Sequence, residues 1–332
     1  MEMRLLCAGV VMLAYALLSR RFLKKKALDT RWKTAAWHGL FLALAGFLVV
    51  MVAALSIESR MRSAADFSTL FSLRHLMPGL LGGLALGGVG FWRAWTRGGT
   101  AEHRGHYLNE DLEWAETIYS AVLLAGLLMS FVIQAFKIPS GSMETTLRIG
   151  DHLFVNRFVY GLRVPLSHKW FMRFWEVRRG DIVVFDFPTA DKDEEHCGSL
   201  QYGKDFIKRV IAVPGDQVEV KEGVVILNNE PQLNEPYAHF MPGESRVPRP
   251  RVPLTAPQYQ KYWEQRLLDK KLGEQMKDNF GPITIAQDDY FVMGDNRDRS
   301  CDGRFWGPVP HRYLKGKAWF IYWPPSRMGF IH

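Results

Sequence analysis

The pattern of apolar and polar positions changes near Phe136. Before that point, long apolar runs alternate with basic stretches, which is typical of helices that cross a membrane. After it, short segments of alternating apolar and polar residues are separated by Gly, Pro and Asn, which is typical of strands joined by turns. The pattern therefore predicts a membrane region over residues 1–136, followed by a mainly antiparallel β domain.

Four apolar segments make up the predicted membrane region: Leu5–Leu18, Trp37–Ile57, Met77–Trp92 and Trp114–Phe136. A helix needs about 20 residues to cross the hydrocarbon core of a bilayer, which is ~30 Å thick. The second and fourth segments have that length. The first is shorter but is followed by arginines that can snorkel, and the third is rich in glycine, which is common where membrane helices pack closely. We predict about four transmembrane helices.

Basic residues between the first two apolar segments indicate the orientation. They are Arg20, Arg21, Lys24, Lys25, Lys26, Arg31 and Lys33. Cytoplasmic loops carry such an excess of positive charge. With four crossings the C-terminal domain lies outside the cytoplasm, whereas with three it would lie inside. The first segment is interpreted as an anchor and not as a cleaved signal peptide, because its charges follow the apolar run.

Six segments of the C-terminal part have the length and composition of strands. They are Gly180–Phe185, Phe206–Val213, Gln217–Lys221, Val224–Leu227, Tyr290–Met293 and Ala318–Tyr322. We assign residues 137–221 and 287–332 to a β core, and residues 222–286 to an inserted β-rich subdomain. Within the insertion, residues 257–276 have the spacing of one amphipathic helix.

The chain carries a formal net charge of +8 and is 48% hydrophobic. A positive charge is also common in proteins that bind nucleic acid, but here the basic blocks lie directly beside apolar spans. They are better explained as the cytoplasmic flanks of membrane helices. We expect no nucleic-acid partner.

The three cysteines are Cys7, Cys197 and Cys301, too few for a disulfide-rich scaffold. Cys197 and Cys301 both fall in the domain expected outside the cytoplasm, where a disulfide can persist. The sequence does not show whether the two residues approach closely enough to pair, and we do not predict a bridge.

A Ser-Gly-Ser motif follows the fourth apolar segment. Taken alone, such a motif is most simply a polar turn. Here Pro139 and Gly141 restrict the backbone on either side of it and place Ser142 beside Met143 and Leu147, so a hydroxyl can lie at the edge of an apolar groove. A serine nucleophile needs a base. No histidine in this half of the chain stands in a recognisable triad context.

A lysine in an apolar strand is the alternative base. With period-two alternation, Phe206 and Lys208 share one face of the strand, while Ile207 and Arg209 share the other. Both faces are apolar, so at least one of the two cations is expected against a buried surface. Arginine stays charged, whereas lysine can lose its proton when it is desolvated. The structural alternative is that Lys208 snorkels from a half-buried strand edge.

The run from Gly294 to Pro310 is dense in Gly, Asp, Asn and Arg. Such a composition predicts a loop with many internal hydrogen bonds and ion pairs. The loop can be a purely structural turn before a strand. Alternatively, it can hold Ser300 against the lysine, with Asp302 and Arg304 as an ion pair that fixes the loop.

These three motifs, together with the strand run Gly180–Phe185, resemble the characteristic boxes of the bacterial type I signal peptidases (leader peptidases). They occur in the family's order, from about Phe136 to Val309 with gaps, and residues 326–332 resemble the family's C-terminus. Thr145 stands where the family usually has Pro, and Cys301 and Gly303 replace residues that are often small or polar. These departures remove no catalytic group but put the rigidity of the loops in doubt.

The resemblance implies a serine endopeptidase with a Ser/Lys dyad and no metal or cofactor. Ser142 is the implied nucleophile and Lys208 the implied general base. The other implied site residues are Ser140 in the oxyanion hole, Ser300 orienting the lysine, and Asp302, Arg304 and Asp295 supporting the loop. The residues implied to line the substrate pocket are Phe136, Ile138, Pro139, Met143, Leu147, Phe206 and Ile207.

The implied substrates are the signal peptides of exported preproteins, with small side chains one and three residues before the cut. An extended peptide of this kind can bind as an added strand. The implied location is the bacterial cytoplasmic membrane, spanned several times, with the catalytic domain on the outer, periplasmic side. The lipid bilayer is then a second partner, and contact with the secretion translocon is compatible with that location.

Other interpretations remain open. The segment Trp170–Trp175 interleaves aromatic and cationic residues and is either buried core or a surface at the membrane interface. A self-cleaving repressor would need a soluble DNA-binding domain in place of membrane spans. A penicillin-binding enzyme would need Lys three residues after the serine, whereas this chain has Thr145 at that distance from Ser142. A membrane scaffold with a non-catalytic β domain is the alternative from a different class.

Overall fold

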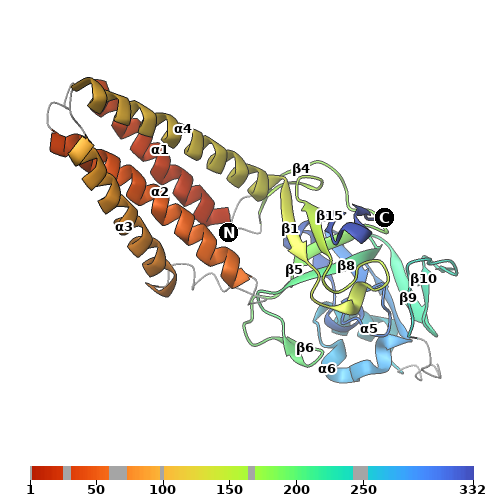
Figure 1. The fold of residues 1–332 in the computed structure, drawn as a ribbon. Coiled ribbons are helices and arrows are strands. Elements are labelled where there is room, and N and C mark those ends of the chain that lie inside the picture. Colours follow the sequence, from red (N-terminus) through yellow and green to blue (C-terminus); the bar gives the residue numbers. More distant parts are fainter. Residues whose placement is uncertain (1, 25–30, 60–72, 98–100, 164–168, 242–252) are drawn as a thin grey trace. The chain divides into compact units, whose positions relative to one another are not determined.

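The computed structural model describes residues 2–24, 31–59, 73–97, 101–163, 169–241 and 253–332. The chain forms two compact units, Met1–Ser130 and Phe131–His332, shown in red to dark gold and in yellow to blue in Figure 1. Among the basic residues that indicate the orientation, Lys25 and Lys26 lie outside the described residues.

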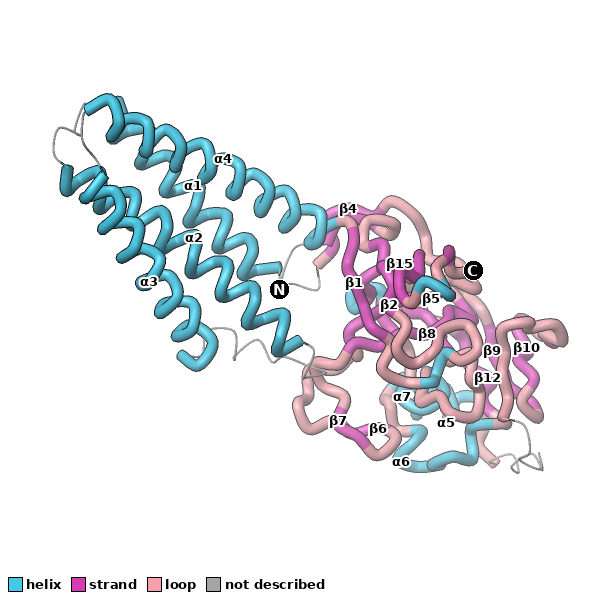
Figure 2. Tube along the Cα trace, in the orientation of Figure 1, coloured by secondary structure: helices cyan, strands magenta, loops and turns pink. Residues whose placement is uncertain are grey.

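The N-terminal unit consists of long helices (Figure 2): α1 (Glu2–Lys24), α2 (Arg31–Ser59), α3 (Leu73–Arg97) and α4 (Ala101–Phe131). Helices α2 and α3 pack closely. A Cβ atom added to Gly83 would lie 2.6 Å from the carbonyl oxygen of Ala43, and one added to Gly87 would lie 2.8 Å from that of Gly39. The glycines of the third apolar segment therefore serve close helix packing, as the sequence suggested.

Helix α2 has the strongest membrane character in this unit. Within the described residues, its stretch Arg31–Val50 is the one helical segment long and apolar enough to cross a membrane by length and composition. The prediction of about four transmembrane helices therefore stays a prediction.

The fourth apolar segment does not stay helical to its predicted end. Helix α4 ends at Phe131, and strand β1 (Ile133–Lys137) pairs antiparallel with β2 (His152–Asn156). The predicted membrane boundary at Phe136 therefore falls inside a strand of the C-terminal unit. The apolar run is continuous across this boundary, and hydrophobicity alone does not distinguish a helix end from a following strand.

The C-terminal unit is built on an eight-stranded sheet in the order β1-β2-β15-β5-β8-β13-β14, with β16 beside β15. Its further strands are β5 (Ile182–Asp186), β8 (Asp205–Ala212), β13 (Asp289–Met293), β14 (Val309–Pro310), β15 (Leu314–Trp323) and β16 (Gly329–Phe330). All of these strands pair antiparallel. This confirms the mainly antiparallel β class predicted for this part of the chain.

A second sheet of four strands has the order β11-β10-β9-β12. Its strands are β9 (Gln217–Lys221), β10 (Val224–Leu227), β11 (Glu230–Pro231) and β12 (Phe280–Thr284). Among the described residues, two short ribbons complete the β structure: β3 (Gly161–Arg163) with β4 (Trp170–Arg173), and β6 (Glu195–His196) with β7 (Ser199–Leu200). The limits of the β core and of the insertion stay predictions.

The single amphipathic helix predicted over residues 257–276 is wrong. The chain forms two short helices, α5 (Ala256–Glu264) and α6 (Leu268–Leu272), followed by the 3-10 turn η3 (Gly273–Lys277). Arg266 between the helices has a φ of 58°, in the left-handed region, so a continuous α-helix cannot pass through it. The buried residues Tyr259, Trp263 and Leu268 still give the segment an apolar face.

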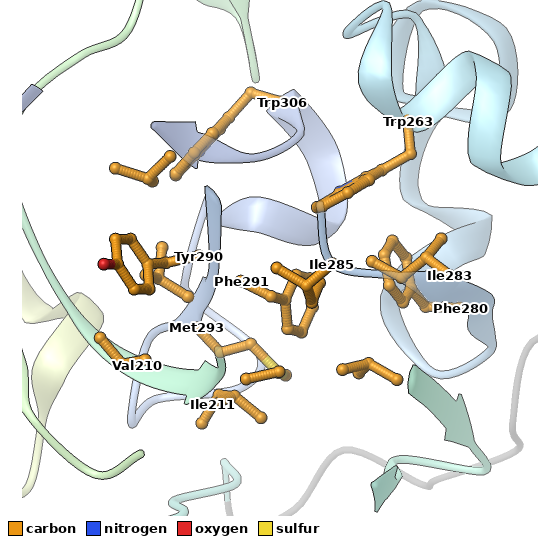
Figure 3. Packing of buried hydrophobic residues seen from close by; sticks show 14 of the residues in the cluster. Val210, Ile211, Trp263, Phe280, Ile283, Ile285, Tyr290, Phe291, Met293 and Trp306 are labelled. Atoms are coloured by element: carbon orange, nitrogen blue, oxygen red, sulfur yellow. The ribbon is translucent and has the colours of Figure 1, made fainter. Parts of the chain in front are cut away.

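Two hydrophobic clusters fill this unit. Figure 3 shows part of the larger one, in which the rings of Phe280 and Phe291 stack with centroids 5.0 Å apart. The smaller cluster contains Met143 and Leu147, both fully buried. Strand β8 contributes to both, because Val210 lies in the larger cluster and Ile207 packs against the smaller one. Burial of apolar surface therefore fixes this strand from two sides.

The aromatic segment Trp170–Trp175 fits both interpretations in part. The side chain of Trp170 packs against the larger cluster and donates its indole N–H to the carbonyl of His311 at 3.3 Å. Phe171, Met172 and Trp175 are instead 73%, 46% and 55% exposed. The ribbon is thus attached to the core at its first residue and presents the others to its surroundings.

Candidate active site

Ser142 lies in the 3-10 turn η2 (Gly141–Met143), which begins a few residues after the end of β1 at Lys137. The side chains of Met143 and Leu147 are fully buried and hold the turn on the smaller cluster. The backbone N–H of Asn296 donates to the carbonyl of Ser142 at 3.1 Å. The serine is therefore fixed through its neighbours and its own backbone, while its hydroxyl stays available for one partner.

That partner is the amine of Lys208. Lys208 Nζ donates to Ser142 Oγ at 2.7 Å and to the carbonyl of Ile207 at 3.1 Å. The lysine is 3% exposed and stands opposite Val183 in the pairing of β5 with β8. Burial lowers the pKa of Lys208 to about 8, against the opposing effect of the Asp302 and Asp295 charges. The fold thus brings together a hydroxyl and an easily deprotonated amine.

Arg209, the next residue of β8, has a different environment. Its guanidinium donates twice to the carboxylate of Asp295, at 2.8 Å and 2.8 Å, and once to the carbonyl of Gly180 at 2.9 Å. Asp295 also accepts a hydrogen bond of 2.5 Å from the hydroxyl of Thr146. The carboxylate therefore links β8 to the chain that follows Ser142.

Residues 294–304, which we call the 294–304 loop, contain a second buried ion pair. The guanidinium of Arg304 donates to both carboxylate oxygens of Asp302 at 2.9 Å, and the N–H of Gly294 donates to the same carboxylate at 3.1 Å. Burial opposes ionisation of Asp302, but the Arg304 charge and these hydrogen bonds lower its pKa below the ordinary value. The charged pair ties the two ends of the loop together.

Ser300 does not orient Lys208 through a hydrogen bond in this structure. Its hydroxyl is buried and has no hydrogen-bond partner among the described residues. The oxygen lies against the backbone of Gly294, where an added Cβ would be 2.2 Å from Ser300 Oγ and 2.4 Å from the carbonyl oxygen of Ser142. A glycine is therefore required where the 294–304 loop meets the Ser142 turn. The role expected for Ser300 stays a prediction.

The remaining predicted site residues surround Ser142 unequally. Ser140 is exposed and extended at the start of η2. Of the predicted pocket residues, Ile138, Met143 and Leu147 are buried in the smaller cluster, Phe136 and Ile207 pack against that cluster, and Phe206 packs against the larger one. Pro139 is exposed. Three of the seven predicted pocket residues are thus core residues, and the other four lie nearer the surface.

A disulfide joins Cys197 to Cys301, with their Cα atoms 6.2 Å apart. The sequence leaves this pairing open, and the structure shows that the two cysteines approach closely enough to form it. The bond links the ribbon of β6 and β7 to the 294–304 loop, next to Ser300. A separation of 104 residues along the chain gave no local signal for this contact.

Sequence reasoning also missed several residues that contact the site through other residues. Thr146 binds Asp295, Tyr237 lies over Arg209, and Glu235 pairs with Arg297. Thr146 is part of the Ser142 motif and could have been considered there. Glu235 and Tyr237 carry no such signal, because they come from the insertion.

The chain is similar to signal peptidases over about two thirds of its length. Residues 111–323 match the family model of the signal peptidases, peptidase S26. The probable signal peptidase I-2 of Synechocystis is 34% identical over 223 residues, covering 67% of this chain and 78% of its own. The signal peptidase I of Pseudomonas aeruginosa is 31% identical over 243 residues, covering 67% and 79%. A signal peptidase I structure from Enterococcus faecalis matches 43% of this chain and 97% of its own at 24% identity, with a TM-score of 0.26.

The antiparallel β domain and the family match together define the class of protein, a serine endopeptidase. More narrowly, the chain belongs to the type I signal peptidases of the peptidase S26 family.

Proposed function

We propose that this protein removes N-terminal signal peptides from exported preproteins, with Ser142 as nucleophile and Lys208 as general base. One observation carries the mechanism: the amine of Lys208 lies 2.7 Å from Ser142 Oγ in a site where it is 3% exposed. A serine hydroxyl hardly ionises by itself near neutral pH, so it needs a base at hydrogen-bond distance.

The reaction follows from the protonation state of the lysine. Neutral Lys208 accepts the proton of Ser142 while Oγ attacks the scissile carbonyl carbon. The backbone N–H of Ser142 and the hydroxyl of Ser140 would stabilise the resulting oxyanion, each such donor being worth ~3–4 kcal/mol. The protonated lysine then gives its proton to the departing amine, and neutral Lys208 activates the water that hydrolyses the acyl-enzyme. Ser300, after a change of rotamer, would hold the amine in line.

Substrate selection is assigned to the apolar residues around η2. Phe136, Ile207 and Phe206 are half-buried and are proposed to contact the peptide directly. Ile138, Met143 and Leu147 are buried in the cluster against which Phe136 and Ile207 pack, and they are proposed to set the depth of the pocket. A shallow pocket excludes large side chains by overlap, which fits cleavage after small residues such as Ala. The peptide would lie extended beside the sheet.

The proposed location is the outer face of the bacterial cytoplasmic membrane, with about four transmembrane helices. Three observations support it: the apolar stretch of α2, the exposed aromatic side chains of the segment Trp170–Trp175, and the Cys197–Cys301 disulfide. Disulfides persist in oxidising compartments and are rare in the cytosol. In addition to the signal peptide, the proposed partners are the lipid bilayer and the secretion translocon.

The test is cleavage of a purified preprotein by the full chain in detergent. Ser142→Ala and Lys208→Ala are each expected to lower kcat by about 10³-fold or more, because the two groups act as a unit. Lys221→Ala is a matched control, since Lys221 lies on β9 with its side chain 50% exposed. Wild-type turnover by either of the first two variants would remove the dyad assignment.

A further inference from the structure

Residues 235–241, which we call the brace, run beside the 294–304 loop although they belong to the predicted insertion. His239 N–H donates to the carbonyl of Asp295 at 2.7 Å, and Arg297 N–H donates to the carbonyl of His239 at 2.9 Å. His239 and Asn296 form an isolated parallel bridge. Met241 N–H adds a hydrogen bond of 2.7 Å to the carboxylate of Asp298. The brace therefore follows the loop as a short additional strand would.

Two side chains of the brace contact buried cations. Glu235 accepts two hydrogen bonds from the guanidinium of Arg297, each 2.8 Å, and the two side chains are 10% and 3% exposed. The ring of Tyr237 lies 4.1 Å from Cζ of Arg209, and its hydroxyl donates to Glu235 at 3.0 Å. A bidentate ion pair fixes the direction of the guanidinium as well as its distance from the carboxylate. A guanidinium that lies over an aromatic ring is attracted to the face of that ring, which restricts its position.

Both arginines are connected to the Ser142–Lys208 pair through neighbouring residues and hydrogen bonds. Arg209 is adjacent to Lys208 in β8 and binds Asp295, which accepts from Thr146. Arg297 follows Asn296, whose N–H donates to the carbonyl of Ser142. A shift of either guanidinium would therefore move the loop against the nucleophile turn and the strand that carries the base.

We propose that Glu235 and Tyr237 are positioning residues for the Ser142–Lys208 pair, acting through Arg297 and Arg209. The proposal rests on the proposed function. A buried guanidinium requires a compensating carboxylate, so loss of Glu235 forces Arg297 to seek another partner or water. Reacting atoms that are misplaced by about 1 Å can cost ~10²-fold in rate, so a small displacement of the loop is enough.

The first experiment separates kcat from KM for cleavage of a synthetic peptide with Ala one and three residues before the scissile bond. Glu235→Gln in the full chain is expected to lower kcat about tenfold or more with KM within about twofold, because the brace is proposed to touch no substrate. Glu230→Gln, on the exposed edge strand β11, is the matched control and is expected to match the wild type.

A second pair of variants leaves no buried charge unpaired. Tyr237→Leu removes the ring over Arg209 while Asp295 still pairs with that guanidinium, and it is expected to lower kcat about threefold to tenfold, as expected for a lost cation–π contact. Tyr237→Phe keeps the ring and is expected to stay near wild-type activity. If Glu235→Gln fails to fold, the comparison of Tyr237→Leu with Tyr237→Phe decides the proposal.

A double-mutant cycle provides the readout that a purely structural role would not change. Thr146→Val removes the other hydrogen bond to Asp295, so its effect on kcat is expected to be non-additive with that of Tyr237→Leu. A wild-type kcat for both Glu235→Gln and Tyr237→Leu would overturn the positioning role of the brace. So would losses of activity that are explained entirely by the fraction of unfolded protein. The proposed function would survive that result as long as Ser142→Ala remains inactive.

Discussion

Lys208 and Arg209 are neighbours on one strand, are equally buried at 3% exposure, and resolve the same electrostatic problem in opposite ways. Arg209 keeps its charge and binds the carboxylate of Asp295 through two hydrogen bonds. Lys208 contacts a hydroxyl and a backbone carbonyl and, in the described part of the chain, forms no ion pair. A buried cation is tolerated when it is paired or when it can lose its proton. Strand alternation separates these two solutions onto opposite faces.

The difference extends to the surroundings of each side chain. Arg297 and Arg304 pair with Glu235 and Asp302, just as Arg209 pairs with Asp295. Arginine suits these positions because it stays protonated and offers a planar, bidentate donor. The carboxylates near the site are thus held by arginines. Lysine, whose pKa responds to desolvation, is left as the group that can act as a base.

Replacing Lys208 with arginine is expected to have the largest effect on the contrast between Lys208 and Arg209. Lys208→Arg keeps a cation but cannot supply a neutral base, so kcat is expected to fall by about 10³-fold or more. The unpaired guanidinium should also lower the free energy of unfolding by ~3–5 kcal/mol. Peptide cleavage and chemical unfolding of the full chain measure the two effects.

Arg209→Lys is the reciprocal variant. A lysine there can still pair with Asp295, so the loss of activity should be much smaller than that of Lys208→Arg. Equal losses in the two variants would mean that Lys208 acts as a charged group, as Arg209 does, and not as a neutral base.

Replacing Lys208 with an apolar residue should show how much the buried amine lowers the free energy of unfolding. The pKa of Lys208 falls from 10.5 to about 8 on folding. The folded state therefore loses ~3 kcal/mol at neutral pH, where the amine is charged in both states. Lys208→Met is expected to be inactive and to have a free energy of unfolding higher by about that amount at pH 7.

The sign of the pH dependence distinguishes this effect from better packing. Between pH about 8 and 10.5 the unfolded wild type binds the proton that the folded state has lost, so wild-type stability rises with pH. The advantage of Lys208→Met should therefore shrink over this range. A constant advantage would indicate packing, and no advantage at pH 7 would indicate that Lys208 is solvated.

The β8 strand and its two cations were predictable because the apolar pattern has period two and both faces are apolar. The same reasoning located β5, β9, β10 and β13 within a few residues, since each has a strong local signal of alternation and turn residues. It failed at β1, where a strand follows a membrane-like helix without any change in hydrophobicity, and at Arg266, where a left-handed residue divides a helical pattern.

The contacts that hold the site were not predictable for a different reason. Glu235 and Arg297, like Cys197 and Cys301, are far apart in the sequence, and their spacing follows no period. Their meeting depends on where the insertion returns to the sheet, which is a property of the tertiary fold. A single chain shows which residues can form such pairs but not which partners they choose.

The pH dependence of wild-type cleavage is the mildest test and reports on Lys208 directly. If the neutral amine is the base, kcat/KM below the pKa of the free enzyme should rise about tenfold per pH unit and level off above pH about 8. The profile should be measured with the synthetic peptide, at constant ionic strength. A midpoint near 10.4 would place the amine in water, and a midpoint near 6.5 would point to a histidine. Either result would remove the contrast between Lys208 and Arg209, because the lysine would then have no more reason than the arginine to give up its charge.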